Sequence, residues 1–329
     1  MAEVLLSHLS ERSVLHDPGA PRFETFVARG RKRLATCSGV SWFRGYHLAV
    51  VNLYGGHVRI YRFHPGGDAA GEPARVELLH ELSEGISYPE DVAVSPDGKW
   101  LAVTHSMSES SRVSLHPIDE SSLAPGPVGE TVRPGRTFHG LRFSPDSRHL
   151  AFTDIGWPGH VEVVRLDSGP WERTCWLENR HAPLKPKSVT FSHDARFVAI
   201  ARAPNASQGE VQGTSDGMLS VHRFDASTGV IAGDALAELR GAGVRLLNPE
   251  MCTFLPGSPG DPYCVLVTDQ AADVVTEYEF DPAERTLAFT RVFVDGLSFP
   301  HGLDASADGR FVAITNYGDD TLRVCRISR

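Results

Sequence analysis

The chain has 329 residues, and its hydrophobic content of 41% predicts a packed globular protein rather than a disordered one. A formal net charge of −9, without any block of Lys and Arg, excludes the basic surface on which nucleic-acid binding depends. No apolar run is long enough to cross a membrane, and residues 1–12 lack the uninterrupted apolar stretch of a secretory signal, so we expect a cytoplasmic protein.

Six copies of one sequence motif follow one another along the chain. In each copy an apolar strand leads into a turn and returns as a second apolar strand; the turn is clearest at residues 95–98, 144–147 and 306–309, as variants of Ser-Pro-Asp-Gly. When the copies are aligned on the second residue of the motif, consecutive copies are 52, 49, 48, 63 and 51 residues apart. A repeat of about 50 residues predicts a β-propeller built from four-stranded blades.

The remaining strands of each copy follow in the order that a blade requires. Third strands with alternating apolar residues are expected at residues 58–63, 113–115, 161–164, 219–224, 274–280 and 322–327. A fourth strand follows in the first five copies, as at residues 74–82 and 287–294, but the last copy stops without one. We predict that residues 22–28 supply the missing strand, because an open sheet edge favours aggregation.

The expected fold is therefore all-β, with a single six-bladed β-propeller of four-stranded blades over residues 22–329. Its last blade is closed by the N-terminal strand, and residues 1–21 form an N-terminal extension.

Residues 203–217, rich in Ser, Gly and Gln, make the longest loop, which is either a lid or a flexible connection. Five scattered cysteines without a C-x-x-C pair suit reduced thiols within strands.

The innermost strand of each propeller blade lines the axial channel, so the residues that begin these strands converge on one mouth of the channel. The aligned positions are Ser38, Glu90, His139, Lys187, Glu250 and His301. In a ring of six, blades two and five place carboxylates opposite each other, and blades three and six do the same with imidazoles.

Two carboxylates and two imidazoles on one axis are suitable ligands for a divalent metal, here Glu90, His139, Glu250 and His301. Imidazole ligands favour zinc, manganese or iron over calcium, which prefers oxygen. Two alternatives stay open: a metal-free catalytic site, or a hydrogen-bonded plug in which Lys187 neutralises a carboxylate.

A second ring is expected on the same face, where the second strands end in Asn52, His105, Asp154, Arg202, Asp269 and Asn316. We predict that His105, Asp154, Asp269 and Asn316 bind substrate together with Ser38, and that Arg202 joins Glu90, Lys187 and Glu250 in catalysis. Asn and Asp are also ordinary turn residues, which remains an alternative for Asn52 and Asn316. The other histidines are expected at the surface, including His57, His64, His116, His149, His160, His193 and His222.

Residues 299–303, Phe-Pro-His-Gly-Leu, followed by the turn and strand at 306–316, resemble the blade signature of the lactonase-type propellers. These are the gluconolactonase and senescence-marker protein (regucalcin) family together with the YVTN-repeat propellers. The resemblance extends over all six copies and implies a metal held at the starts of the innermost strands, where Glu90, His139, Glu250 and His301 stand. The family uses acidic and amide ligands, so the histidines here and Lys187 depart from its pattern, and related propellers that are lyases on cyclic esters use His and Glu.

The leading expectation is a metal-dependent, lactonase-like hydrolase that acts on a small polar cyclic substrate at the axial mouth. A metal-free lyase, isomerase or cyclase that uses Lys187 and the axial carboxylates is the first alternative. The second is a propeller without catalytic activity that binds a partner on its rim, since fold does not fix function. Motifs of nucleotide-binding proteins are absent from the sequence.

Overall fold

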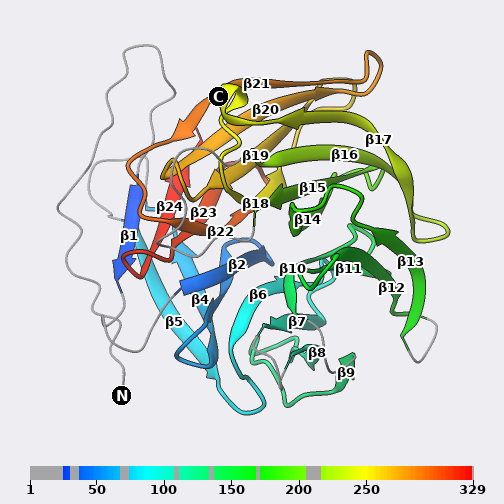
Figure 1. Ribbon diagram of the computed structural model, residues 1–329. Helices are drawn as coiled ribbons and strands as arrows, with labels where there is room; N and C mark the ends of the chain where they lie inside the picture. The colour runs from blue at the N-terminus through cyan, green and yellow to red at the C-terminus, as the bar shows by residue number, and fades with distance from the viewer. Residues whose placement is uncertain are drawn as a thin grey trace.

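The computed structural model describes residues 25–29, 37–66, 74–106, 111–132, 137–167, 171–204 and 216–327. Within them, six four-stranded antiparallel sheets are arranged around a central axis (Figure 1). This arrangement is a six-bladed β-propeller, and the predicted all-β fold is confirmed. The described helical element, η2 (Ala242–Val244), is a single 3-10 turn between blades four and five.

Each of the first five blades contains four strands that run outward from the axis in chain order. Blade one consists of β2 (Cys37–Phe43), β3 (His47–Asn52), β4 (His57–His64) and β5 (Arg75–Leu82). Blade two consists of β6 (Pro89–Val94), β7 (Trp100–His105), β8 (Arg112–Pro117) and β9 (Glu130–Val132). Blade three consists of β10 (Phe138–Phe143), β11 (His149–Asp154), β12 (His160–Arg165) and β13 (Glu172–Glu178). Blade four consists of β14 (Lys185–Phe191), β15 (Phe197–Ala203), β16 (Met218–Asp225) and β17 (Val230–Arg240), and blade five of β18 (Pro249–Phe254), β19 (Tyr263–Asp269), β20 (Val274–Asp281) and β21 (Thr286–Val294).

Blade six is built from both ends of the described chain. It contains β22 (Pro300–Ala305), β23 (Phe311–Asn316) and β24 (Thr321–Arg326), and its outer strand is β1 (Thr25–Arg29). The antiparallel register runs from Thr25 opposite Cys325 to Arg29 opposite Thr321. The prediction that an N-terminal strand completes the last blade is confirmed. The proposed extension, residues 1–21, and residues 205–215 of the predicted loop lie outside the described residues.

The turn that identified the repeat is fixed by its own side chains in four blades. The serine hydroxyl donates a hydrogen bond to the aspartate two residues later, and it accepts one from the backbone N–H five residues later. The serines that act in this way are Ser95, Ser144, Ser192 and Ser306. Because both bonds hold the turn between the first and second strands, this short motif sets the hairpin that faces the axis.

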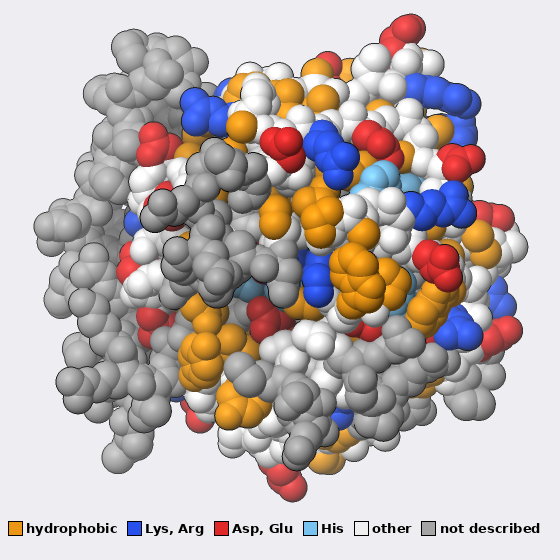
Figure 2. Space-filling view, viewed as in Figure 1, with side chains coloured by type: hydrophobic (Ala, Val, Ile, Leu, Met, Phe, Trp, Pro, Cys, Tyr) orange, Lys and Arg blue, Asp and Glu red, His pale blue; other side chains and the backbone are white. Residues whose placement is uncertain are grey.

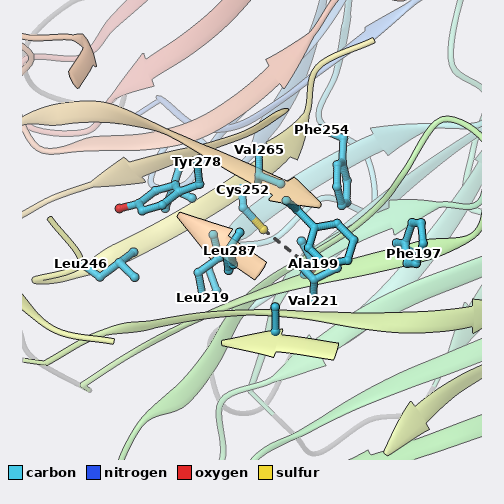
Figure 3. Close-up of a cluster of buried hydrophobic side chains, with 14 residues drawn as sticks. Phe197, Ala199, Leu219, Val221, Leu246, Cys252, Phe254, Val265, Tyr278 and Leu287 are labelled. Atoms are coloured by element: carbon cyan, nitrogen blue, oxygen red, sulfur yellow. Dashed lines mark hydrogen bonds between the residues drawn. The ribbon is translucent and has the colours of Figure 1, made fainter. Parts of the chain in front are cut away.

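Hydrophobic cores lie between neighbouring blades. Buried side chains in the described residues form six clusters, each shared by two adjacent blades. Figure 3 shows the cluster between blades four and five, where Phe197 and Leu219 approach Cys252, Phe254 and Tyr278. Each blade therefore depends on both neighbours for burial of its two faces, and the innermost strands contact one another around the complete ring.

The surface carries charges of both signs. On the face shown in Figure 2, Lys and Arg side chains are interspersed with Asp and Glu, and apolar side chains gather near the middle. No helix in the described part of the chain is both long and apolar enough to span a membrane.

Every innermost strand is irregular at the position of its axial residue. Pairing with the second strand shifts register after the first residues of the strand in all six blades, for example between Pro89 and Val92 and between Pro300 and Leu303. A bulge of this kind bends a strand and changes the direction of a side chain. It also frees a backbone N–H that needs another partner.

Threonines of the second strand provide that partner in blades two, three, five and six. Each hydroxyl accepts a hydrogen bond from the N–H that follows the axial residue of its own blade, at 2.7–2.9 Å. Each also donates to the carbonyl of the axial residue in the next blade: His139, Lys187, His301 or Ser38. The threonines are Thr104, Thr153, Thr268 and Thr315. One hydroxyl therefore fixes a bulge and joins two blades.

Removal of β1 tests how much the closure between the two ends contributes. A chain that begins at residue 31 loses the strand that pairs with β24, so we expect the melting temperature to fall by at least roughly 5 °C. The measurement is differential scanning calorimetry of both proteins at one pH. A chain that begins at residue 22 is the matched control and should melt like the full chain; equal melting of all three would contradict the closing role of β1.

Candidate metal centre

Four of the six predicted axial residues form one compact cluster. Glu90, His139, Glu250 and His301 are each no more than 8% exposed, and one ligand atom from each lies within 4.8 Å of the other three. They come from β6, β10, β18 and β22, the innermost strands of blades two, three, five and six. The bulges therefore bring together residues that are up to 211 positions apart in the sequence.

Carboxylate and imidazole groups alternate around this cluster. His301 Nε2 is 3.0 Å from Glu90 Oε1 and 3.2 Å from Glu250 Oε1. His139 Nε2 is 2.8 Å from Glu250 Oε1 and 3.4 Å from Glu90 Oε1. The two imidazole rings stack with their centroids 5.5 Å apart. All four Nε2 and Oε1 atoms consequently face one point.

The remaining two axial residues contact this cluster from the side. Lys187 Nζ lies 3.4 Å from Glu250 Oε1, and the Lys187 carbonyl lies 2.9 Å from His139 Nδ1. Ser38 Oγ donates to the carbonyl of Glu90, and it lies 3.4 Å from His301 Nδ1. All six predicted positions are therefore brought together.

Electrostatic coupling keeps this cluster charged despite its burial. Burial raises the pKa of Glu90, but the hydrogen bond from His301 and the two imidazole charges outweigh it and lower the pKa to about 2. Burial also opposes ionisation of Glu250, but Lys187 and His139 hold its pKa well below the ordinary value. For His301, burial lowers the pKa, whereas hydrogen bonds and charges from both carboxylates raise it to about 10.

The donor set fits a divalent cation. The Lys187 carbonyl can only accept a hydrogen bond, so His139 Nδ1 carries the proton in this contact. The Nε2 atom of His139 then either carries a second proton or offers a lone pair to a cation. Glu250 Oε2 is buried and has no hydrogen-bond partner among the described residues. Ligands about 2.0–2.1 Å from one metal stand roughly 3.0–3.4 Å apart, which is close to the four N–O distances observed. The buried Glu-His-Glu-His cluster could therefore hold a metal ion.

Solved structures of other proteins share the fold that carries this cluster. No protein-family model and no curated protein sequence matches the chain. Among solved structures, a gluconolactonase from Xanthomonas campestris superposes with a TM-score of 0.59 over 96% of this chain and 94% of its own, at 14% identity. The periplasmic gluconolactonase of Pseudomonas aeruginosa gives a TM-score of 0.59 over 90% and 82% of the two chains, at 20% identity.

The chain has the lactonase-type propeller fold. This fold also occurs in virginiamycin B lyase from Staphylococcus aureus, which matches with a TM-score of 0.51 over 93% of this chain and 100% of its own, at 12% identity. At such identities the similarity concerns the fold, and the chemistry of this propeller has to be argued from its own residues.

The predicted second ring has its hydrogen bonds within the blades. Asp269 accepts bonds from the N–H groups of Leu247, Asn248, Ala271 and Ala272, and Asn316 bonds the Ser298 N–H and the Thr321 hydroxyl. Asp154 accepts the Gly156 N–H, and Arg202, 2% exposed, donates to Ser220 Oγ. These bonds hold loops and strands of each blade, and the catalytic and substrate-binding roles of these residues stay predictions.

His105 belongs to a buried polar chain that sequence reasoning missed. Its Nδ1 contacts the Ser87 carbonyl, and its Nε2 contacts Ser114 Oγ, which in turn contacts His116. Ser220 links Arg202 to His222 in the same way in blade four. The expectation that the other histidines lie at the surface was wrong for His116, His149, His160 and His222, which are at most 2% exposed. It is confirmed for His193, which is exposed, while His57 and His64 are partly exposed.

Two tyrosines beside the cluster were also missed. The Tyr317 ring stacks on His301 at a centroid distance of 5.9 Å, and its hydroxyl is 3.1 Å from that of Tyr54, which is 54% exposed. Both stand in loops between second and third strands, where blade three also carries an aromatic residue, Trp157. Only the aromatic character of two short turns next to axial strands could have indicated them.

The buried histidines predict a loss of stability in acid. Burial lowers the pKa of His105 and of His222 to about 4, although backbone hydrogen bonds partly oppose this. Between pH 6.5 and 4 the unfolded chain then binds more protons than the native one, so stability falls as pH falls, by up to about 3 kcal/mol per histidine.

Urea unfolding across this range should show a smaller pH dependence for His105→Gln than for the wild type. A control variant at the half-exposed His181, His181→Gln, should retain most of the dependence; an unchanged dependence in His105→Gln would contradict a buried neutral imidazole.

Proposed function

We propose that the protein is a metal-dependent enzyme that hydrolyses a small polar cyclic substrate such as a lactone. The observation that carries this proposal is the buried cluster of Glu90, His139, Glu250 and His301, whose ligand atoms converge at the starts of the innermost strands. The fold shared with two gluconolactonases supports the same class of substrate. Convergent titratable groups with strongly shifted pKa values are typical of functional sites.

The four cluster residues would hold a divalent metal, and the two imidazoles favour zinc, manganese or iron over calcium. Bound there, the metal would polarise the substrate carbonyl and lower the pKa of a water molecule. The Nδ1 contacts of both histidines, to the Lys187 carbonyl and to Ser38 Oγ, orient each Nε2 toward that position.

Other residues of the mouth act directly on the substrate in this proposal. The Lys187 ammonium stabilises the negative charge that develops on the carbonyl oxygen during attack. Glu90 has the more exposed carboxylate of the pair, at 10% against 1% for Glu250, so Glu90 is the carboxylate that would leave the metal to the other three ligands and accept the proton of the attacking water. Tyr54 and Tyr317 offer aromatic surface that packs against the substrate ring and excludes water.

Elemental analysis tests this proposal. Protein purified without a metal-affinity column should contain close to one equivalent of zinc, manganese or iron, because two carboxylates and two imidazoles converge on one point. His139→Ala and His301→Ala should each lose nearly all of the metal, whereas His181→Ala should retain it. Hydrolysis of a lactone panel should fall with the metal content. A folded wild type that takes up no metal from added divalent ions would overturn the metal-dependent proposal.

A second candidate is a metal-free lyase, isomerase or cyclase. The contact of 3.4 Å between Lys187 Nζ and Glu250 Oε1 favours it, because this pair could exchange a proton with a substrate without a metal. The similarity in fold to virginiamycin B lyase supports the same alternative.

Activity measured with and without a chelator distinguishes the metal-dependent hydrolase from the metal-free lyase, isomerase or cyclase. If the hydrolase proposal holds, EDTA removes activity, added metal restores it, and Lys187→Met retains metal while its turnover falls by about 10²–10³-fold. If the lyase candidate holds, activity survives EDTA and disappears in Lys187→Met. The discriminating measurement is the turnover of both proteins with and without chelator, together with metal content.

A further inference from the structure

The opposite end of the axial channel holds a cavity that the proposed function does not use. Three residues after each axial residue, the innermost strands place a second ring of side chains: Ser41, Ala93, Arg142, Thr190, Thr253 and Asp304. All six line one cavity of about 320 Å³. This volume is within the range of small-molecule sites in proteins.

Arg142 separates this cavity from the metal cluster. Its guanidinium crosses the axis from blade three, donating to Asp91 Oδ2 at 3.0 Å in blade two and to the Leu303 carbonyl at 2.9 Å in blade six. It also donates to the carbonyls of its own neighbour Leu141 and, at longer distances, of Val92 and Val40. A buried cation held by three other blades closes the channel, so a ligand in the cavity would not reach His139 or Glu90.

The floor of the cavity carries more carboxylates than cations. Arg142 bonds Asp91 and also interacts with a second carboxylate, Asp304. Asp304 accepts hydrogen bonds from the backbone N–H groups of Trp42 and Ala305 and lies 3.4 Å from Thr253 Oγ1. These neighbours are uncharged, so one buried arginine serves two carboxylates.

A second hydroxyl in the lining of this cavity is available to a ligand. Thr190 lines the cavity, and its hydroxyl makes no hydrogen bond among the described residues. Thr190 and Thr253 therefore offer two hydroxyls in the cavity that the Asp304 carboxylate also lines.

Aromatic side chains form part of the walls. Phe43, Phe143, Phe191 and Phe254, one from each of four blades and each at most 7% exposed, line the cavity where the innermost strands end. Arg44 also lines the cavity, but it is solvent-exposed, so water screens its charge, and its guanidinium donates to the carbonyls of Glu120 and Asp97. His193 is likewise occupied, at 3.1 Å from the Phe254 carbonyl.

We propose that this cavity is a binding site for a small organic amine that carries an apolar or aromatic group. The protonated amine would sit on the floor, donating hydrogen bonds to Asp304 and to the hydroxyls of Thr190 and Thr253, and it would place a second cation beside the two carboxylates. The apolar group would pack between the phenylalanines, whose ring faces also attract cations. This site is independent of the metal cluster and of the reaction proposed there.

Calorimetric titration with 2-phenylethylamine tests the site, with 2-phenylethanol and phenylacetate as matched neutral and anionic probes. We expect one amine per chain and binding at least about tenfold tighter than that of the alcohol, because hydrogen bonds to a charged group contribute about 1.5–3 kcal/mol. Phenylacetate should not bind. The absence of saturable amine binding up to about 10 mM, or equal binding of amine and alcohol, would overturn the proposal.

Three variants locate the binding. Asp304→Asn should weaken amine binding by about tenfold or more, and Thr190→Val, which keeps the side-chain shape, by about fivefold. Lys187→Met alters charge at the other end of the channel and should leave amine affinity unchanged. If Asp304→Asn fails to fold because Trp42 loses its carboxylate partner, Thr190→Val still decides: affinity equal to the wild type would place the amine elsewhere and refute the site.

Discussion

A single hydroxyl in each of four blades determines how the axial residues are arranged. Thr104, Thr153, Thr268 and Thr315 each satisfy the N–H released by a bulge and reach the carbonyl of the next axial residue. Because the second bond crosses a blade boundary, the position of one axial side chain depends on its neighbour. Glycines make this close approach possible: a Cβ on Gly140 would lie 2.6 Å from the Lys187 carbonyl oxygen, and one on Gly302 would lie 2.4 Å from that of Ser38. The support of the cluster is therefore a set of backbone groups bridged across four of the six blade boundaries, and the cluster side chains are attached to it.

Burial of charge along the axis requires that each ion have a partner. At one mouth, two carboxylates face two imidazoles and Lys187, and the pKa of His301 is raised to about 10 while that of Glu90 is lowered to about 2. In the middle, Arg142 balances Asp91. Buried ions that lack such partners cost several kcal/mol, so a sequence would rarely keep this many on one axis for stability alone. Burial of this charge is more readily understood if the axis binds ligands.

The repeat made the architecture predictable, because every blade contains the same turn and the same two apolar strands. It also gave the six axial positions, since residues at equivalent places in a ring must converge. The repeat says less about side-chain direction. At the ends of the second strands, Asp269 and Asn316 bond the backbone of their own loops, and their role in substrate binding stays a prediction. Alternating patterns identify strands without showing where a bulge will turn a side chain, and a buried chain such as His105–Ser114–His116 has no signature at all in the sequence.

Backbone groups carry most of the bonds that hold the ring together. The turn serines and the bridging threonines bond mainly to them, so these bonds make few demands on the side chains at the axis. The axial residues of this chain are Glu, His, Glu and His with Lys187 beside them, and the proton on His139 Nδ1 leaves Nε2 to be completed by a second proton or by a cation. For the two proposed reactions, metal-dependent hydrolysis and proton transfer without a metal, the difference therefore lies in what occupies the space between these four atoms.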